Sequence, residues 1–369
     1  MLSPQSPIKV LLLTQNIGSI ECSTDEMTAE NREMTLQWIK SVAAFVQDVD
    51  VLVLHVQEIG GKKFNRAFND YLRSVISQCY PDAAWCSGLM GPARDDNTTF
   101  TALGSAFFLS ERVVDKAKLF SFTKKEFIPV TNWNENERDT FYQGTKFSNV
   151  GTSRKGYSLS TLKFGEKTLN FVNAHLLHDA DNSVAVSQPH PSEYSLKRAE
   201  ALTEAMATIS KHDEPLFLFG DFNLRLDTHR LKAMLEEKFK EEIQVMKKKI
   251  HASDKVWEYL EDNQNLLTLK ELDQDAPFLR QTVHDATGLS LQELAIEFGP
   301  TYLLEDDPSK QTRNDKPCYK RRSRFLAWCD RVWFNEAGKA LLHDEKYWTA
   351  SFHPMDHLPV YLQFSLHLD

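Results

Sequence analysis

Four apolar stretches of this chain each end in a short polar cluster, and this pattern constrains the fold more than any other feature. Several stretches are continuous rather than alternating, which is typical of β-strands covered on both faces. The clusters that follow them are Thr14-Gln15-Asn16, Gln57-Glu58, Asn173-Ala174-His175 and Gly220-Asp221-Phe222-Asn223. Functional side chains carried at strand ends are typical of α/β scaffolds. We therefore expect an α/β fold whose strand ends meet at one polar site.

The remaining periodicities predict further strands and helices. Strands are expected over residues 8–16, 51–57, 101–109, 168–175, 216–223, 331–334 and 359–366. Helices are expected over residues 33–45 and 191–210, and a charged helical region over residues 227–260, in which Lys247-Lys248-Lys249 forms a solvated face. Because the late strands have no helices between them, we expect an α/β sandwich rather than a doubly wound sheet.

The polar clusters also bear on the number of domains. A chain of 369 residues is long enough for two domains, but the clusters run from Asn16 to His357 and any boundary would divide them. We therefore expect one domain over residues 1–369. The formal net charge is -9, so the protein as a whole attracts neither nucleic acid nor an anionic membrane surface. A polyanionic substrate would have to bind a local cationic patch.

Cysteine usage and the short apolar runs indicate a cytoplasmic protein. The five cysteines are scattered and include no Cys-x-x-Cys pair, which argues against a disulfide framework and a zinc ribbon. The apolar run at residues 10–13 is too short for a secretory signal or a transmembrane segment. No cysteine follows Cys329, and the sequence leaves open a lipidated tail and peripheral binding at the plasma membrane.

Two of the clusters carry candidate metal ligands. Glu58 follows an apolar strand and precedes Gly60-Gly61, which lets the chain turn away and leave the carboxylate in a cleft. Asn16 lies just before Gly18 in a similar position. One carboxylate, one amide and retained waters are a usual ligand set for Mg²⁺. The alternatives are that Glu58 caps an element and that Asn16 stabilises a turn.

The other clusters carry candidate acid–base groups. Asp221 and Asn223 are two residues apart after a buried strand, so one can accept a proton from water while the other orients it. Asp330 can bind one nitrogen of His357 and favour the protonated ring, which would donate to phosphoryl oxygens. Alternatively, Asp221 forms an Asx turn and His175 is a satisfied core histidine. The joint occurrence of these groups favours a metal-assisted phosphoryl hydrolase.

Motifs along nearly the whole chain resemble those of the inositol polyphosphate 5-phosphatases, in the exonuclease-endonuclease-phosphatase superfamily. The motifs are Thr14-Gln15-Asn16-Ile17-Gly18, Gln57-Glu58-Ile59-Gly60-Gly61-Lys62, Ser153-Arg154-Lys155-Gly156, Asn173-Ala174-His175-Leu176, Gly220-Asp221-Phe222-Asn223-Leu224-Arg225, Trp328-Cys329-Asp330-Arg331 and Asp356-His357-Leu358-Pro359-Val360. Residues 175–182, with Arg198 behind them, most resemble the type I branch, which acts on inositol 1,4,5-trisphosphate. The resemblance implies a deoxyribonuclease I-like four-layer α/β sandwich, with two packed mixed sheets flanked by helices.

The resemblance also implies an activity, a cofactor and residue roles. The activity is Mg²⁺-dependent hydrolysis of the 5-phosphate of a soluble inositol polyphosphate, namely the trisphosphate and as a further candidate the 1,3,4,5-tetrakisphosphate, which ends a calcium signal. The implied metal ligands are Glu58, Asn16 and Asp356, and the implied catalytic residues are Asp221, Asn223, His357, Asp330 and His175. The implied substrate contacts are Arg154, Lys155, Asn173, Arg198, Tyr302, Lys316, Lys320, Arg321, Arg322, Arg324 and Arg331. Whether Asp221 or His357 is the general base stays open.

Three positions depart from the family pattern. Leu326 and Met355 stand where the family usually has proline and serine or glycine, and we expect altered packing there rather than lost chemistry. Leu303 stands where other members place a lysine that binds the 4-phosphate. We therefore expect the basic segment of residues 316–324 to close over the inositol ring, the alternative being a solvated loop.

Three other functions share parts of the pattern. A phosphoinositide lipid 5-phosphatase would use the same residues on a membrane substrate. A nuclease of the same superfamily would share Glu58, Asp221 and His357, but the net acidity and the lack of a basic stripe argue against it. An inactive binding module is disfavoured because the charged residues of the motifs are all retained.

Overall fold

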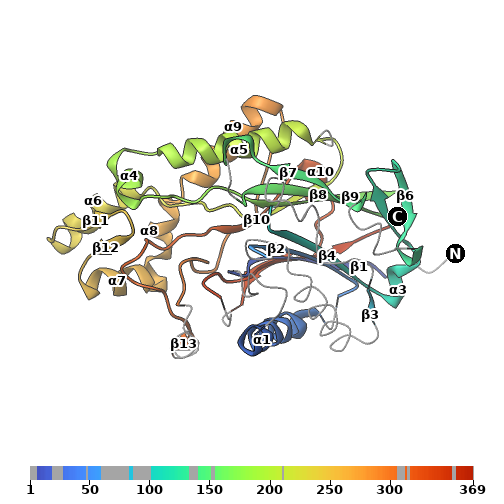
Figure 1. The fold of residues 1–369 in the computed structure, drawn as a ribbon, viewed down its shortest axis with the longest axis horizontal. Helices are drawn as coiled ribbons and strands as arrows, with labels where there is room; N and C mark the ends of the chain where they lie inside the picture. The colour runs from blue at the N-terminus through green and yellow to red at the C-terminus, as the bar shows by residue number, and fades with distance from the viewer. Residues whose placement is uncertain are drawn as a thin grey trace.

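The computed structural model describes residues 6–18, 28–46, 49–59, 83–85, 101–132, 140–150, 154–209, 212–305, 312–313, 316–350 and 355–368. In this part of the chain, two large β-sheets pack face to face, and helices lie outside them (Figure 1). None of the helices among these residues is long and apolar enough to cross a membrane.

The first sheet has its strands in the order β16-β17-β1-β2-β4-β3. Their bounds are Lys346–Thr349 (β16), Val360–Leu366 (β17), Ile8–Asn16 (β1), Val51–Gln57 (β2), Leu103–Ser110 (β4) and Ala83–Trp85 (β3). The sheet is mixed, because β1 pairs with β2 in parallel and with β17 in antiparallel orientation. The parallel pair aligns Asn16 with Gln57, so the polar residues at the ends of both strands lie at one edge.

The second sheet has the order β15-β10-β9-β8-β5-β6, and β7 pairs with β8. The bounds are Asp330–Phe334 (β15), Leu216–Asp221 (β10), Lys167–His175 (β9), Gly156–Phe164 (β8), Ala117–Ser121 (β5), Glu126–Pro129 (β6) and Gln143–Lys146 (β7). β10 runs parallel to β9, which aligns Asp221 with His175, and antiparallel to β15, which aligns Asp221 with Asp330. Three predicted site residues are therefore neighbours across this sheet.

Helices cover the outer face of each sheet (Figure 1). α1 (Ala29–Val46) lies on the first sheet, where Trp38 packs in one cluster with Leu11 of β1. α5 (Glu193–Thr208) and α9 (Asp275–Thr287) cover the second sheet. The other helices are α3 (Glu111–Val114), α4 (Asn182–Ser187), α6 (Thr228–Phe239), α7 (Asp254–Glu261), α8 (Leu266–Glu271) and α10 (Glu336–Lys339), with 3₁₀ turns η1 (Val130–Asn132), η3 (Ser148–Val150) and η4 (Asn263–Asn265). This layering confirms the predicted α/β sandwich.

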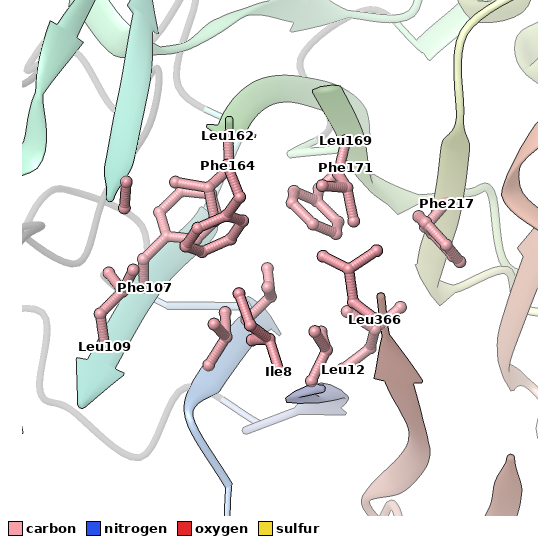
Figure 2. Close-up of a cluster of buried hydrophobic side chains, with 14 of the residues drawn as sticks. Ile8, Leu12, Phe107, Leu109, Leu162, Phe164, Leu169, Phe171, Phe217 and Leu366 are labelled. Carbon is pink, nitrogen blue, oxygen red and sulfur yellow. The ribbon is translucent and has the colours of Figure 1, made fainter. Parts of the chain in front are cut away.

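The core between the sheets fixes how the strand ends meet. Along β1, Val10 and Leu12 belong to the core between the sheets, whereas Leu11 and Leu13 belong to the cluster under α1. This division follows from the alternation of side chains along a strand buried on both faces. Figure 2 shows the core, with Leu12 of β1 opposite aromatic side chains such as Phe171 of β9. Dense packing of these side chains holds the two sheets at a fixed distance.

The region of residues 227–260, predicted as a charged helical region, is helical at its two ends but not in its middle. α6 and α7 are separated by a hairpin of β11 (Gln244–Met246) and β12 (Lys249–His251). The prediction was wrong because Val245 and Ile250, which pair across the hairpin, pack in a core cluster while their strand neighbours are exposed. This is the alternation of a strand. Lys247 and Lys248 form the exposed turn of the hairpin, and Lys249 is the exposed first residue of β12.

Candidate active site

The polar strand ends of the two sheets meet at one place. Nδ2 of Asn16, at the end of β1, donates to Oδ2 of Asp221, at the end of β10, over 3.0 Å. Nε2 of His175, at the end of β9, lies 3.1 Å from the same oxygen. Glu58, directly after β2, places Oε1 3.9 Å from His175 Nε2. Sheet packing therefore gathers groups that are far apart in the sequence.

These groups surround a cavity of about 500 Å³. The predicted site residues that line it are Asn16, Glu58, Lys155, Asp221, Asn223, Tyr302, Arg324, Asp356 and His357. His175 and Asp330 are buried behind this lining and contact Asp221 and His357, respectively. Cavities of this size commonly hold small-molecule ligands. The structure thus brings together most of the predicted metal ligands and catalytic residues.

Asp221 is held as an anion by converging donors. Oδ1 accepts a hydrogen bond from the backbone N–H of Asn223 at 2.8 Å, and Oδ2 accepts from the Asn223 side chain at 3.1 Å. Burial by itself raises the pKa of this carboxyl, but the charge of His357 and the hydrogen bond from His175 hold that pKa well below its usual range. Asp221 is therefore ionised at neutral pH.

His357 forms a buried pair with Asp330. His357 Nδ1 lies 2.8 Å from Asp330 Oδ2, which also accepts a 2.8 Å hydrogen bond from the Thr301 hydroxyl. Burial lowers the pKa of His357, but Asp330 and Asp221 outweigh it and raise that pKa to about 10. Burial raises the pKa of Asp330 to about 6, so at pH 7 the pair is an imidazolium facing a carboxylate. His357 is thus a hydrogen-bond donor in this state, not a base.

Glu58, Asn16 and Asp356 form an oxygen-rich side of the pocket. Glu58 has a φ of 62°, a left-handed conformation that is uncommon for glutamate and concentrates at functional sites. Burial raises its pKa, but His175 and Lys155 lead the charges that lower it, so the carboxylate is ionised at neutral pH. Carboxylate and amide oxygens are ligands that Mg²⁺ prefers, so the donor set fits this cation.

A second cluster with metal-ligating atoms has a different character. Ligand atoms of Asp221, Asp330 and His357 all lie within 4.8 Å of one another. A metal ion binds the neutral ring of histidine, whereas the two carboxylates keep His357 protonated and Asp330 occupies its Nδ1. The cluster is better described as a hydrogen-bonded acid–base set, and the oxygen-rich side with Glu58 is the better candidate for a metal site.

Lys155 joins the two sides of the pocket. Its Nζ contacts His175 Nε2, and its side chain is buried. Burial lowers the pKa of Lys155 to about 8, although Asp221 and Glu58 oppose the shift. The ammonium group is therefore largely charged at pH 7 and titrates just above it. Nη2 of Arg154 lies 4.0 Å from Glu58 Oε2, at the rim of the same side.

Two predicted substrate contacts lie in buried ion pairs instead. Arg198 donates from Nη1 to Asp179 at 2.5 Å and from Nη2 to Asp275 at 2.6 Å, and its side chain has no exposed surface. Arg331 forms a bidentate pair with Glu293, with both distances 2.6 Å. Neither arginine lines the pocket, because carboxylates from other helices and loops hold them in the interior. We therefore do not propose these residues as substrate contacts.

Asn173 is also placed away from the pocket. Its Nδ2 donates to the carbonyl oxygens of Val56 and Gly104 at 3.3 and 2.9 Å, and its Oδ1 accepts from Gln57 Nε2 at 2.8 Å. These partners belong to the first sheet, whereas Asn173 belongs to β9 of the second. Asn173 thus ties the sheets together beneath the site rather than binding substrate.

The basic segment of residues 316–324 does not close over the pocket as a unit. Arg321 forms a bidentate pair with Glu261, with distances of 2.8 and 2.7 Å. Arg322 is exposed and lies 3.6 Å from Asp254. The side chain of Lys316 lies outside the described residues, and Lys320 does not line the cavity. Arg324 is the segment's described contribution to the pocket.

Sequence reasoning did not select three residues that the structure places at the site. His178 lines the pocket, Arg225 donates from Nη2 to Asn223 Oδ1 at 3.1 Å, and Thr301 binds Asp330. His178 and Arg225 lie within stretches already compared with the family, so their motifs carried the signal. For Thr301, the sequence carried no signal other than its position directly before Tyr302.

Leu326 and Met355, the two departures from the family pattern, both lie in apolar clusters. Leu326 is buried in the cluster around α6 and α7. Met355 is buried with the residues under α1, and it also lines the pocket. Neither position removes a charged group from the site.

Comparisons with known proteins identify the family of the chain. The sequence model of Endonuclease/Exonuclease/phosphatase family 2 matches residues 27–363. The chain is 26% identical to "Probable type I inositol 1,4,5-trisphosphate 5-phosphatase" of Caenorhabditis elegans, over 97% of this chain and 100% of that protein. It is also 26% identical to "Inositol polyphosphate-5-phosphatase A" of Rattus norvegicus, over 97% of this chain and 93% of that protein. These relatives are phosphoric monoester hydrolases.

A solved structure supports the fold independently. The inositol polyphosphate 5-phosphatase domain of SPsynaptojanin, in complex with inositol (1,4)-bisphosphate and calcium ion, superimposes with a TM-score of 0.59. The match covers 97% of this chain and 84% of that chain at 15% sequence identity. At this identity the likeness concerns the fold, so the function has to be argued from the residues of the site.

Proposed function

The chain belongs to Endonuclease/Exonuclease/phosphatase family 2, and we propose that it is a Mg²⁺-dependent phosphatase that removes the 5-phosphate from soluble inositol polyphosphates such as inositol 1,4,5-trisphosphate. The supporting observation is the pairing, in one cavity, of an oxygen-rich side with a set of cationic donors around the ionised Asp221. The names of the full-length relatives direct the proposal to this substrate class. The proposal also places the protein in the cytoplasm, where such a substrate would be met.

The metal would be held by Glu58, with Asn16 and Asp356 beside it. When bound, Mg²⁺ would neutralise charge on the transferred phosphoryl group and on the oxygen that leaves with the inositol ring. The three residues supply two carboxylates and an amide, and a hard cation of this kind keeps several positions for water and substrate oxygens. Asn16 is fixed for this role, because its Oδ1 accepts the Gly18 N–H at 2.9 Å.

Asp221 would orient the attacking water and accept its proton. His357 cannot act as the base in this state because its ring already carries a proton, which leaves Asp221 as the acceptor. The low pKa of Asp221 makes it a weak base until substrate arrives. A phosphate dianion beside it would raise that pKa, since a like charge disfavours the ionised form. The reaction consumes one water and yields inorganic phosphate and the dephosphorylated inositol.

Cationic donors would hold the phosphoryl oxygens during the reaction. His357 presents its Nε2–H toward the Asp221 side, 4.0 Å from Oδ2, while Asp330 fixes the ring through Nδ1. Lys155 adds an ammonium group next to His175. Donors that are already oriented stabilise a phosphoryl transition state without further reorganisation, which is the main contribution a protein makes to this chemistry.

The test is phosphate release from inositol 1,4,5-trisphosphate, with phosphorus NMR to identify the product. We expect inositol 1,4-bisphosphate, dependence on Mg²⁺, and loss of turnover in Asp221→Asn at unchanged melting temperature. Parallel assays with the lipid substrate in vesicles and with single-stranded DNA test the two rival enzyme functions. The absence of phosphate release by folded protein at saturating Mg²⁺ would contradict the proposal.

A further inference from the structure

A buried glutamine at the end of β1 contacts His357 from outside the pocket. Gln15 directly precedes Asn16, and successive side chains of a strand point to opposite faces. Asn16 lines the pocket, whereas Gln15 shares its face with Leu11 and Leu13, which pack in the apolar cluster under α1. Gln15 is 1% exposed. An amide buried beside an apolar cluster is costly unless its groups are hydrogen-bonded.

Both ends of the Gln15 amide have a partner, and the partners fix its orientation. The indole Nε1 of Trp38, on α1, donates to Gln15 Oε1 at 2.8 Å. Gln15 Nε2 donates to the backbone carbonyl oxygen of His357 at 3.0 Å. An indole N–H can only donate and a carbonyl oxygen can only accept, so a flipped amide would lose both hydrogen bonds. Gln15 therefore has one allowed orientation, with its donor on His357.

The carbonyl that Gln15 binds belongs to the peptide unit that follows His357, and this unit is held at both of its polar groups. Its N–H, from Leu358, donates to the backbone oxygen of Thr301 at 2.9 Å. The Thr301 hydroxyl also binds Asp330, whose Oδ2 lies 2.8 Å from His357 Nδ1. The ring and the main chain of His357 are thus fixed by separate contacts, and Gln15 holds the main chain.

The direction of the His357 ring depends on where its main chain lies. The hydrogen bond between Nδ1 and Asp330 fixes one edge of the ring, and the Cα atom fixes the other. In the proposed reaction Nε2–H donates to a phosphoryl oxygen, and this nitrogen lies 4.0 Å from Asp221 Oδ2. A misplacement of about 1 Å can cost a reacting group about a hundredfold in rate. A contact to the main chain can therefore change the rate without touching the substrate.

We propose that Gln15, oriented by Trp38, is a positioning residue that fixes the main chain of His357 and thereby aims its Nε2–H at the phosphoryl group. This inference rests on the proposed function and adds a residue to the same site. Gln15 is not among the described residues that line the cavity, so its effect passes through His357. The end of β1 then has two roles, with Asn16 on the pocket side and Gln15 on the α1 side.

The test replaces the amide and measures kcat, KM for inositol 1,4,5-trisphosphate and the melting temperature. Gln15→Met removes both hydrogen bonds and keeps an unbranched side chain of similar length. Leu13→Met is the matched control, because it places the same side chain two residues earlier on the same face of β1. Trp38→Phe is a second variant, which leaves Gln15 in place but removes the donor that orients it, and it decides the question if Gln15→Met does not fold.

We expect Gln15→Met to reduce kcat about tenfold to a hundredfold and to change KM less than about twofold. The reason is that the ring of His357 is misdirected in the transition state, while the groups that bind the substrate stay in place. Trp38→Phe should reduce kcat less, and Leu13→Met should leave it unchanged. A purely structural role of Gln15 would instead lower the melting temperature and leave the kcat of the folded protein at the wild-type value.

A double-variant cycle with His357→Gln separates an effect through His357 from an effect through the neighbouring Asn16. His357→Gln removes the ring that Gln15 is proposed to aim. Adding Gln15→Met to His357→Gln should therefore reduce kcat by less than about a further twofold. Losses that multiply in the double variant would overturn the proposal, because they would show that Gln15 acts through Asn16 or through the packing of β1.

The failure of this inference can be distinguished from the failure of the proposed function. If folded wild-type protein releases no phosphate from inositol 1,4,5-trisphosphate at saturating Mg²⁺, the proposed function fails and the positioning role fails with it. If the wild-type protein is active, and folded Gln15→Met and Trp38→Phe both keep the wild-type kcat, the positioning role is overturned and the proposed function stands.

Discussion

The protein contains two buried clusters of charged residues. They differ in whether protein groups take up all of their hydrogen bonds and charges. Around Arg331, Glu293 accepts two hydrogen bonds from the guanidinium and a third from the Tyr347 hydroxyl at 2.9 Å. Asp273 accepts a further hydrogen bond from Arg331 Nη1 at 2.8 Å. Around Asp221, carboxylates, imidazoles and an ammonium group surround a cavity of about 500 Å³. The first cluster is closed on itself, whereas the second is open to a ligand.

The comparison teaches how to separate structural charge from chemical charge. Arg331 and Asp330 are adjacent in one strand, and side chains alternate along a strand. Asp330 therefore points to His357, and Arg331 points to the other face of the sheet, where Glu293 and Asp273 bind it. Both residues are buried and both belong to the same motif. What distinguishes them is that the groups around Asp330 border a cavity and can still bind a ligand, whereas the hydrogen bonds of Arg331 are taken up by protein groups.

The largest expected effect concerns the Asp330–His357 pair. Asp330→Asn and His357→Gln should each reduce kcat by about a thousandfold, and the double variant should be no worse than the poorer single variant, because the two residues act as one unit. Steady-state rates and melting temperatures check this. Losses that multiply in the double variant would show that the residues act independently.

The closed cluster should respond in stability rather than activity. Arg331→Met leaves Glu293 and Asp273 buried without their cation, and breaking such a pair costs about 3 to 5 kcal/mol of unfolding free energy. Chemical denaturation measures the loss. The kcat of the folded fraction should stay near the wild-type value, and a loss of kcat without a loss of stability would move Arg331 into the catalytic site.

The open cluster should show a basic limb in its pH profile. Burial lowers the pKa of Lys155 to about 8. Its charge is therefore present below pH 8 and is lost as the pH rises through that value, so kcat/KM should fall about tenfold per pH unit above it. Lys155→Arg should move the fall to higher pH, because arginine stays charged. A profile of Lys155→Arg with the same basic limb would assign the limb to another group.

The smallest effect is expected for Arg321 and Arg322, the part of the basic segment that lies outside the pocket. Arg321 forms a partly exposed pair with Glu261, and Arg322 lies near Asp254 at the surface; pairs open to solvent in this way contribute about 0 to 1 kcal/mol. Replacing both arginines with glutamine should change the Michaelis constant for inositol 1,4,5-trisphosphate less than about twofold at moderate salt. A large increase that disappears as salt rises would restore the segment as a substrate-binding loop.

Much of the site could be predicted from sequence because its residues directly follow apolar strands along the chain. Asn16, Glu58 and Asp221 each follow an apolar strand, and parallel pairing brings the ends of neighbouring strands together. The pair of Asp330 and His357 followed from complementary chemistry in two motifs. These features depend only on which strand ends meet at one edge of a sheet, and not on the detailed packing of side chains.

The remainder depended on contacts between distant segments. Arg198 meets carboxylates at Asp179 and Asp275, the latter 77 residues away, and no local pattern marks these partners. Arg225 and Arg324 likewise reach one corner from separate loops. The central strand β8 was not among the predicted strands, and the hairpin within residues 227–260 was predicted as helix. In each case tertiary burial, rather than the local sequence, decides the outcome.

The most direct test of the account is a Mg²⁺ titration of phosphate release from inositol 1,4,5-trisphosphate by wild-type protein, Glu58→Gln and the control Glu166→Gln. Glu166 pairs with Lys163 at an exposed turn, so its loss should have no effect on activity. A bound cation contributes several kcal/mol, so Glu58→Gln should lose at least about a hundredfold in rate and need more Mg²⁺ for half-maximal activity. Folded Glu58→Gln with the wild-type rate and Mg²⁺ dependence would contradict the assignment of the open cluster as a metal-assisted phosphatase site.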